Sequence, residues 1–79
     1  MERSIGQQAQ KTGIGYIADR TPGNGQPIAR LVTRPETGGE WGLCLDSGKR
    51  VTAPTDEPIY DEETAARQEA TRRWGRPHA

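Results

Sequence analysis

The feature that most constrains the fold is a two-residue alternation within residues 40–52. From position 41 to position 45 every second residue is large and apolar, namely Trp41, Leu43 and Leu45. A period of two places these side chains on one face of a strand. An Asp-Ser-Gly sequence, typical of a tight turn, follows the strand, and an extended run follows the turn. This stretch therefore predicts a β-hairpin.

Other segments have the composition of strands or of a helix. Residues 13–20 and 27–34 read as strands, and the Pro-, Gly- and Asn-containing residues 21–26 between them predict a second hairpin. Residues 53–59 contain two prolines, which favour an extended connector. The last expected element is a helix over residues 61–74, followed by a Gly and a Pro that stop it. The chain thus predicts strands first and a helix last.

The predicted helix carries several local signals. Asp61 is a favourable N-cap residue, and the acidic residues after it suit the positive end of the helix dipole. Glu63 with Arg67, and Glu69 with Arg73, have the i, i+4 spacing at which opposite charges on a helix attract. These signals place the start of the helix at Asp61.

The apolar residues of this helix form one stripe, which we expect to cover the large apolar face of the central hairpin. Alanines allow a helix to lie close to a sheet, and a tryptophan adds buried area. The expected fold class is α+β, a small antiparallel sheet of three to four strands with one C-terminal helix packed on a face. The predicted contact joins Trp41, Leu43 and Leu45 to Ala66, Ala70 and Trp74, and leaves Gly42 and Cys44 on the opposite face.

The chain is short for a self-sufficient domain. It has 79 residues, of which 30% are hydrophobic, and chains below about 80 residues rarely gain more than about 3–5 kcal/mol from one core. We expect a single domain over residues 13–79, preceded by a flexible polar tail over residues 1–12. The single cysteine, Cys44, cannot form an intrachain disulfide. A protein partner or a homodimer is the remaining source of reinforcement.

Hydropathy bears on the location of the protein. No apolar run approaches the ~18 residues that a membrane span requires. The first residues are polar and glutamine-rich, unlike the apolar core of a secretory signal. We therefore expect a cytoplasmic protein that does not associate with a membrane.

Residues with catalytic potential are few. His78, the only histidine, stands one residue from the end of the chain, where a side chain is rarely held in place. Cys44 alternates with leucines in a predicted strand, where cysteine usually acts as a small apolar group. No Cys/His cluster has the spacing of a metal site. We therefore expect no enzyme activity, no metal and no cofactor.

Charge is strongly segregated along a chain whose net charge is zero. Residues 35–66 carry eight acidic and two basic groups, whereas both flanking segments are basic. We call residues 56–63 the acidic segment. A solvated face with a helix cap is the simpler interpretation, but a rigid acidic surface also complements a basic, nucleic-acid-binding surface on a partner protein. The candidate partner-binding residues are Asp56, Glu57, Tyr60, Asp61, Glu62 and Glu63.

Arginines on the predicted strands support an alternative function. Arg20, Arg30, Arg34 and Arg50 can all stand on or beside the strands, and the last three are the leading candidates for such a site. A three-stranded sheet followed by a helix is similar in layout to the small DNA-binding modules of phage-type integrases, which implies that the sheet reads the major groove. Neighbouring acids and the zero net charge oppose this interpretation, since attraction to phosphate requires a basic excess.

The short length, the order of strands and helix over residues 13–74, and the acidic segment together resemble the small phage-encoded anti-CRISPR proteins at the level of class. The resemblance rests on no shared motif and transfers no individual functional residue. It implies a non-enzymatic inhibitor that binds a type I CRISPR surveillance complex (Cascade) and blocks its binding to target DNA inside the bacterial host cell.

Overall fold

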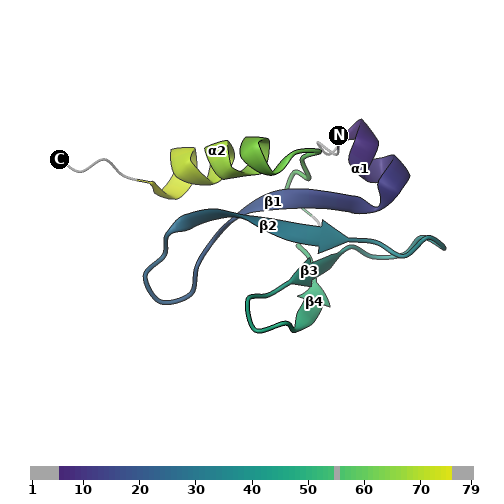
Figure 1. Ribbon diagram of the computed structural model, residues 1–79, viewed down its shortest axis with the longest axis horizontal. Coiled ribbons are helices and arrows are strands. Elements are labelled where there is room, and N and C mark those ends of the chain that lie inside the picture. Colours follow the sequence, from purple (N-terminus) through teal and green to yellow (C-terminus); the bar gives the residue numbers. More distant parts are fainter. Residues whose placement is uncertain (1–5, 55, 76–79) are drawn as a thin grey trace.

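The structure of the protein, a computed structural model, describes residues 6–54 and 56–75. This part of the chain forms one short helix, four strands and a second helix (Figure 1). It has an α+β fold, an open four-stranded antiparallel sheet with a C-terminal helix, as the sequence predicts. The elements are α1 (Gln7–Thr12), β1 (Ile14–Arg20), β2 (Pro27–Thr33), β3 (Gly42–Cys44), β4 (Arg50–Thr52) and α2 (Glu63–Trp74).

The sheet is a meander in which each strand pairs with its neighbour in the sequence, in the order β1-β2-β3-β4. β1 and β2 pair along their whole length of seven residues. β2 pairs with β3 only through Val32 and Thr33, which lie opposite Leu43 and Gly42. β3 and β4 pair at three positions and form the predicted central hairpin. The two hairpins therefore share a short seam and diverge away from it (Figure 1).

Turn chemistry explains both hairpins. Gly48 adopts a φ of 91°, a left-handed conformation that side chains oppose, and its N–H donates to the Leu45 carbonyl at 2.9 Å. In the loop between β1 and β2, the Thr21 N–H donates to the Gln26 carbonyl at 3.0 Å and closes the loop. Both turns confirm the sequence predictions.

Register divides the sheet into two faces, because opposed residues of an antiparallel pair share a face and successive residues alternate. Each face is covered by a different part of the chain. The first, which we call the helix face, carries Tyr16, Ala18, Ala29 and Leu31. The second, which we call the core face, carries Ile17, Arg30, Val32 and Leu43.

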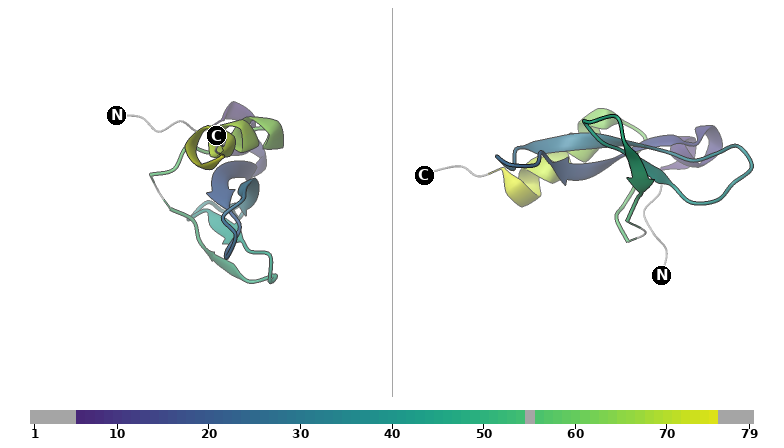
Figure 2. Two further views of the ribbon diagram at one scale, coloured as in Figure 1. Left: turned by 90° about the vertical axis from the view of Figure 1, so that its left-hand side faces the viewer. Right: turned by 90° about the horizontal axis from the view of Figure 1, so that it is seen from below.

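α2 packs on the helix face over β1 and β2 and does not reach β3 or β4 (Figures 1 and 2). The buried residues of α2 are Ala66 and Ala70, and Ala18 on the sheet is buried as well. Since all three side chains are small, the helix lies close to the strands. Near the end of α2, the Arg20 guanidinium stacks on the Trp74 ring, 5.0 Å from its centroid.

The predicted contact between the central hairpin and α2 is wrong. Leu43 lies opposite Val32 on the core face, whereas α2 lies over the alternate residues of β2. Trp41 and Leu43 pack instead against the buried cluster of the core face. The alternation itself is confirmed, because Gly42 and Cys44 lie on the face opposite to Leu43. Leu45 lies beyond the end of β3 and is half-buried.

The core face holds a thin apolar cluster. The largest side chain that is less than 2% exposed is Val32, so nothing bulkier is fully enclosed among the described residues. A core of this size supports only a modest free energy of unfolding. Its buried members are Ala9, Ile17, Val32, Ala53 and Ile59.

Residues 7–12, which the sequence predicts as part of a flexible tail, form helix α1 instead. Ala9 of this helix is fully buried in the core cluster. The Gly6 N–H donates to the Ile59 carbonyl at 2.8 Å and ties the start of the helix to the connector. The polar composition of α1 conceals it in the sequence, because Ala9 is its single buried residue. The first five residues of the predicted tail lie outside the described residues.

α2 begins at Glu63, with Glu62 as its N-cap residue, two positions later than the predicted start at Asp61. Glu62 is extended, with φ −122° and ψ 144°, and no side chain caps the helix within the described residues. The role of Asp61 as the N-cap of α2 is therefore a wrong prediction. Its carboxylate has a different partner, which lies in α1.

Candidate partner-binding surface

The acidic segment, residues 56–63, follows the outer edge of β1 and leads into α2 (Figure 1). Tyr60 forms an isolated antiparallel bridge with Tyr16. The Tyr60 N–H donates to the Tyr16 carbonyl at 2.7 Å, and the Tyr16 N–H donates to the Tyr60 carbonyl at 3.0 Å. The segment is thus fixed to the sheet through its backbone, independently of its charges.

Asp61 fixes the same segment to α1. Its Oδ1 accepts the Ala9 N–H at 2.8 Å. Ala9 is the third residue of α1, the position whose N–H an N-cap side chain normally satisfies, and the N-cap residue here is Gly6. A carboxylate from elsewhere in the chain therefore caps this helix. Asp61 has a structural role besides any role in binding.

Glu57 is held by the end of α2. Both of its carboxylate oxygens accept from Arg73 Nη1 at 3.2 Å, and the two side chains are each 25% exposed. Arg73 also donates to Glu69 at 2.8 Å. The positive charge of Arg73 opposes that of Glu57, so this acid contributes less negative potential to the surface than an unpaired one would. Since 16 residues separate Glu57 from Arg73, no local sequence pattern indicates the pair.

Tyr60, the aromatic residue among the candidate partner-binding residues, is half-buried. Burial raises the pKa of its hydroxyl, and the charge of Glu69 adds to the rise. The phenol is therefore neutral at physiological pH. The charges that act on this hydroxyl are those of Glu57 in the acidic segment and of Glu69, Arg72 and Arg73 in α2.

Four acids of the segment are exposed, Asp56, Asp61, Glu62 and Glu63, and only the Asp61 side chain among them accepts a hydrogen bond within the described residues. Glu63 lies 4.0 Å from Arg67, and the two side chains are 58% and 61% exposed, so their attraction is weak. The structure thus separates the six candidates into two groups. Glu57, Tyr60 and Asp61 hold the segment in place, while Asp56, Glu62 and Glu63 face solvent from it.

The arginines of the alternative, DNA-binding site also differ in how deeply they are buried. Arg30 is 5% exposed on the core face, where Asp19 accepts from it at 3.0 Å and Asp46 at 2.7 Å. Burial opposes its charge, but the hydrogen bonds to both acids outweigh that effect and raise the pKa of Arg30. This arginine is an internal part of the fold.

Arg34 and Arg50 lie nearer the surface. The Arg34 guanidinium stacks on the Trp41 ring at 5.0 Å from its centroid and also donates to the Gln10 carbonyl at 3.1 Å. Arg50 Nη2 donates to the Thr33 hydroxyl at 2.7 Å. The stacking of Arg34 on Trp41 has no local sequence signal, because it depends on how the loop between β2 and β3 folds back.

The sequence pointed to few residues with catalytic or metal-binding potential, and the structure locates some of them. Within residues 6–54 and 56–75, no three His, Cys, Asp or Glu side chains gather where they could hold a metal ion. Cys44 is a free, half-buried thiol. His78 lies outside the described residues. The described part of the chain also contains no helix with the length and apolar character of a membrane span.

Comparison of the chain with protein-family models, with curated proteins and with solved structures finds no match.

Proposed function

We propose that this protein is a non-enzymatic inhibitor that binds a basic surface of a protein complex through the acidic segment. The observation that carries the proposal is the fixed position of a segment with four exposed acids, of which Asp56, Glu62 and Glu63 make no side-chain hydrogen bond among the described residues. Tyr60 pairs with β1, and Asp61 caps α1. A charged surface that is ordered before binding loses less conformational entropy when it docks.

Charge complementarity indicates the kind of partner. Grooves that bind nucleic acid carry lysines and arginines, and an acidic surface accelerates its encounter with such a groove and sets the register of docking. Tyr60 lies beside the exposed acids, and tyrosines are frequent among the residues that contribute most to binding. An occupied groove is closed to nucleic acid, which makes the binder an inhibitor without any chemistry.

The most specific form of the proposal follows from the resemblance to anti-CRISPR proteins. The partner is then a type I CRISPR surveillance complex, the competitor is its target DNA, and the site of action is the cytoplasm of the bacterial host. The length of 79 residues and the α+β order support this form at the level of class.

The test is a pull-down of the purified surveillance complex with wild-type protein and with the double variant Asp56→Lys/Glu62→Lys. We expect the variant to lose binding, since both new cations face a basic groove. Glu57 and Asp61 stay unchanged, because both make contacts that hold the segment in place. Glu63 also stays, to preserve the first turn of α2.

The matched control is Glu36→Lys/Glu40→Lys, which changes the net charge equally at two exposed acids in the loop between β2 and β3. The control should bind as the wild type does, and circular dichroism should show that both variants fold. Equal binding by wild type and by folded Asp56→Lys/Glu62→Lys would overturn the proposed surface. No binding by the wild-type protein would overturn the proposed partner.

The alternative function is DNA binding through Arg34 and Arg50. The stacking of Arg34 on Trp41 favours it, since an ordered arginine beside an aromatic ring suits a phosphate or a base. Against it, Arg30 is paired inside the fold, and Glu36 and Glu40 are exposed in the same loop as Trp41. A mobility-shift assay on random duplex DNA at low salt separates the functions. Tight, salt-sensitive binding that Arg34→Ala abolishes would favour the alternative.

A further inference from the structure

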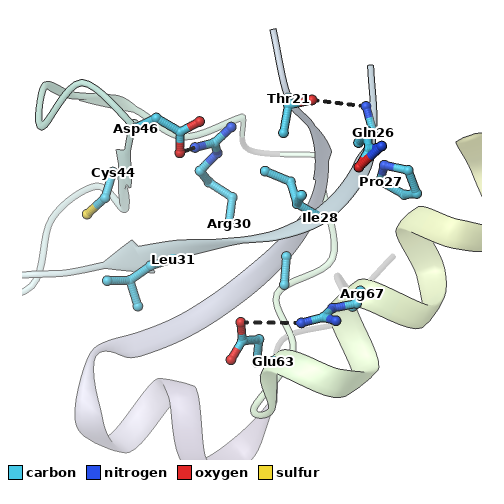
Figure 3. Close-up of a pocket in the computed structure, with 11 residues that line it drawn as sticks. Thr21, Gln26, Pro27, Ile28, Arg30, Leu31, Cys44, Asp46, Glu63 and Arg67 are labelled. Atoms are coloured by element: carbon cyan, nitrogen blue, oxygen red, sulfur yellow. Dashed lines mark hydrogen bonds and ion pairs between the residues drawn. The ribbon is translucent and has the colours of Figure 1, made fainter. Parts of the chain in front are cut away.

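A groove lies where the two hairpins diverge, between β2 and the β3–β4 hairpin (Figure 3). Its volume is about 570 Å³. In Figure 3, Arg30 and Ile28 point to one side of β2, and Leu31 points to the side on which Glu63 and Arg67 of α2 lie. Leu31 is 37% exposed. The residues that line the groove include Pro27, Ala29, Leu31, Cys44, Asp46 and Arg67.

The backbone of β2 has an open edge along this groove. The N–H and carbonyl of Tyr16 both bond to Tyr60, so they point away from β2. Leu31 lies opposite Tyr16, and Ala29 lies opposite Ala18 two residues along. Because the bonding direction alternates along a strand, the backbone groups of Ala29 and Leu31 point away from β1, toward the groove.

β3 does not complete this edge. Its pairing with β2 covers Val32 and Thr33 and stops there, because the chain turns at Leu45 into the hairpin loop. The N–H and carbonyl of Ala29 have no hydrogen-bond partner among the described residues. Unpaired groups at a strand edge are a template for another extended backbone.

The charges around the groove are balanced. Arg30 pairs with Asp46 at 2.7 Å, and Arg67 lies 4.0 Å from Glu63, so two cations face two anions. A polyanion such as nucleic acid gains little from such a lining. The remaining lining side chains are uncharged. Leu31, Ala29 and Cys44 are small or apolar, and Thr21 and Gln26 are polar. They suit the side chains of an uncharged strand.

We propose that this groove binds an extended, uncharged segment of a partner protein, which adds to β2 as a strand. The main chain of the segment pairs with Ala29 and with the N–H of Leu31, and its alternate side chains lie against Leu31 and Cys44. This surface shares only Glu63 with the acidic segment. It provides a second contact that main-chain hydrogen bonds make specific for a β-strand.

Cys44 offers a direct test. The capped peptide Cys-Thr-Val-Thr-Val-Thr is attached to Cys44 through a disulfide, and amide hydrogen exchange is measured by NMR on the ¹⁵N-labelled protein. We expect exchange at Ala29 and Leu31 to slow about tenfold, the order of effect that one or two hydrogen bonds produce. The matched control is the same peptide with alternate N-methyl groups, which keeps the side chains but removes donors, and should leave both rates unchanged.

Equal rates with and without the unmodified peptide, or equal protection by both peptides, would overturn the proposal. Protection that rises with protein concentration in the absence of peptide would overturn it as well, because a second copy of the chain would then be the occupant. If Cys44 does not react, Gln26→Cys in a Cys44→Ser background attaches the peptide at the other end of the groove. None of these outcomes involves Asp56 or Glu62, which do not line the groove and are the residues exchanged to test the acidic segment, so each proposal can fail alone.

Discussion

The Asp61 carboxylate accepts a hydrogen bond from the Ala9 N–H at 2.8 Å, across 52 positions of the chain. Gly6, the N-cap residue of α1, has no side chain to make this bond, and a Cβ at Gly6 would collide with the Asp61 carboxylate. The glycine and the aspartate thus act together as one cap. A helix of six residues is too short to be stable alone, so this bond and the burial of Ala9 hold it.

Asp61→Ala is expected to lower the free energy of unfolding by about 0.5–2 kcal/mol, the usual cost of losing an N-cap side chain. The loss should be localised, because the carboxylate supports α1 and not α2. Urea unfolding measures the total, and amide hydrogen exchange should show faster exchange at Ala9. Asp56→Ala is the control, since Asp56 is exposed and should change neither measurement. Faster exchange confined to the first turn of α2 would contradict this assignment.

Gly15→Ala is expected to destabilise the fold by about 1–3 kcal/mol, as overpacking of a core does. A Cβ at Gly15 would lie 2.6 Å from Ile59 Cγ2 and 3.1 Å from the Ala9 Cβ, both in the core cluster. Gly42→Ala is the matched control in the same sheet, where the nearest atoms belong to the flexible guanidinium of Arg50. Thermal unfolding should therefore show the larger loss for Gly15→Ala, and equal losses would contradict the close approach of α1 to the sheet.

Arg30 and its two acids should respond unequally to substitution. Asp19 and Asp46 are 33% and 66% exposed, so water can solvate their carboxylates when the arginine is removed, and Arg30→Met should cost within about 1 kcal/mol. Removing both acids leaves a guanidinium that is 5% exposed without either partner. Asp19→Ala/Asp46→Ala should therefore cost about 2–3 kcal/mol, less than for a wholly buried pair. Chemical unfolding of both variants tests this order. A larger loss in the free energy of unfolding for Arg30→Met than for Asp19→Ala/Asp46→Ala would contradict it.

Acid should destabilise the protein through Glu69. Hydrogen bonds from Arg72 and then Arg73, at 2.6 to 2.9 Å, lower the pKa of this carboxyl from 4.5 to about 2. Its contribution to stability is complete above the unfolded-state value and is lost as pH falls from 4.5 toward 2, because the unfolded chain binds the proton first. Melting temperature measured over that interval should fall less steeply for Glu69→Gln. The control is Glu63→Gln, which removes an exposed acid 4.0 Å from its arginine. A wild-type slope in Glu69→Gln would refute the role of Glu69.

Of the candidate surface, the sequence indicated where the acids concentrate, and all of them except Glu57 are exposed. It could not indicate that Glu57 pairs with Arg73 or that Asp61 caps α1, because these partners are 16 and 52 residues away. No sequence pattern indicated the groove beside β2. It exists because β3 turns away at Leu45, and the point at which two hairpins separate depends on their packing.

By itself the sequence determined the hairpins, the helix and the α+β class, because periodicity and turn chemistry act between residues close in the chain. The tertiary structure alone decided which face of the sheet each part covers. Both faces of β2 carry apolar groups, Val32 on one and Leu31 on the other, so alternation does not say where α2 packs. The strand register and the folding of α1 and Ile59 onto the core face together decided where α2 packs. Both depend on contacts between residues far apart in the chain.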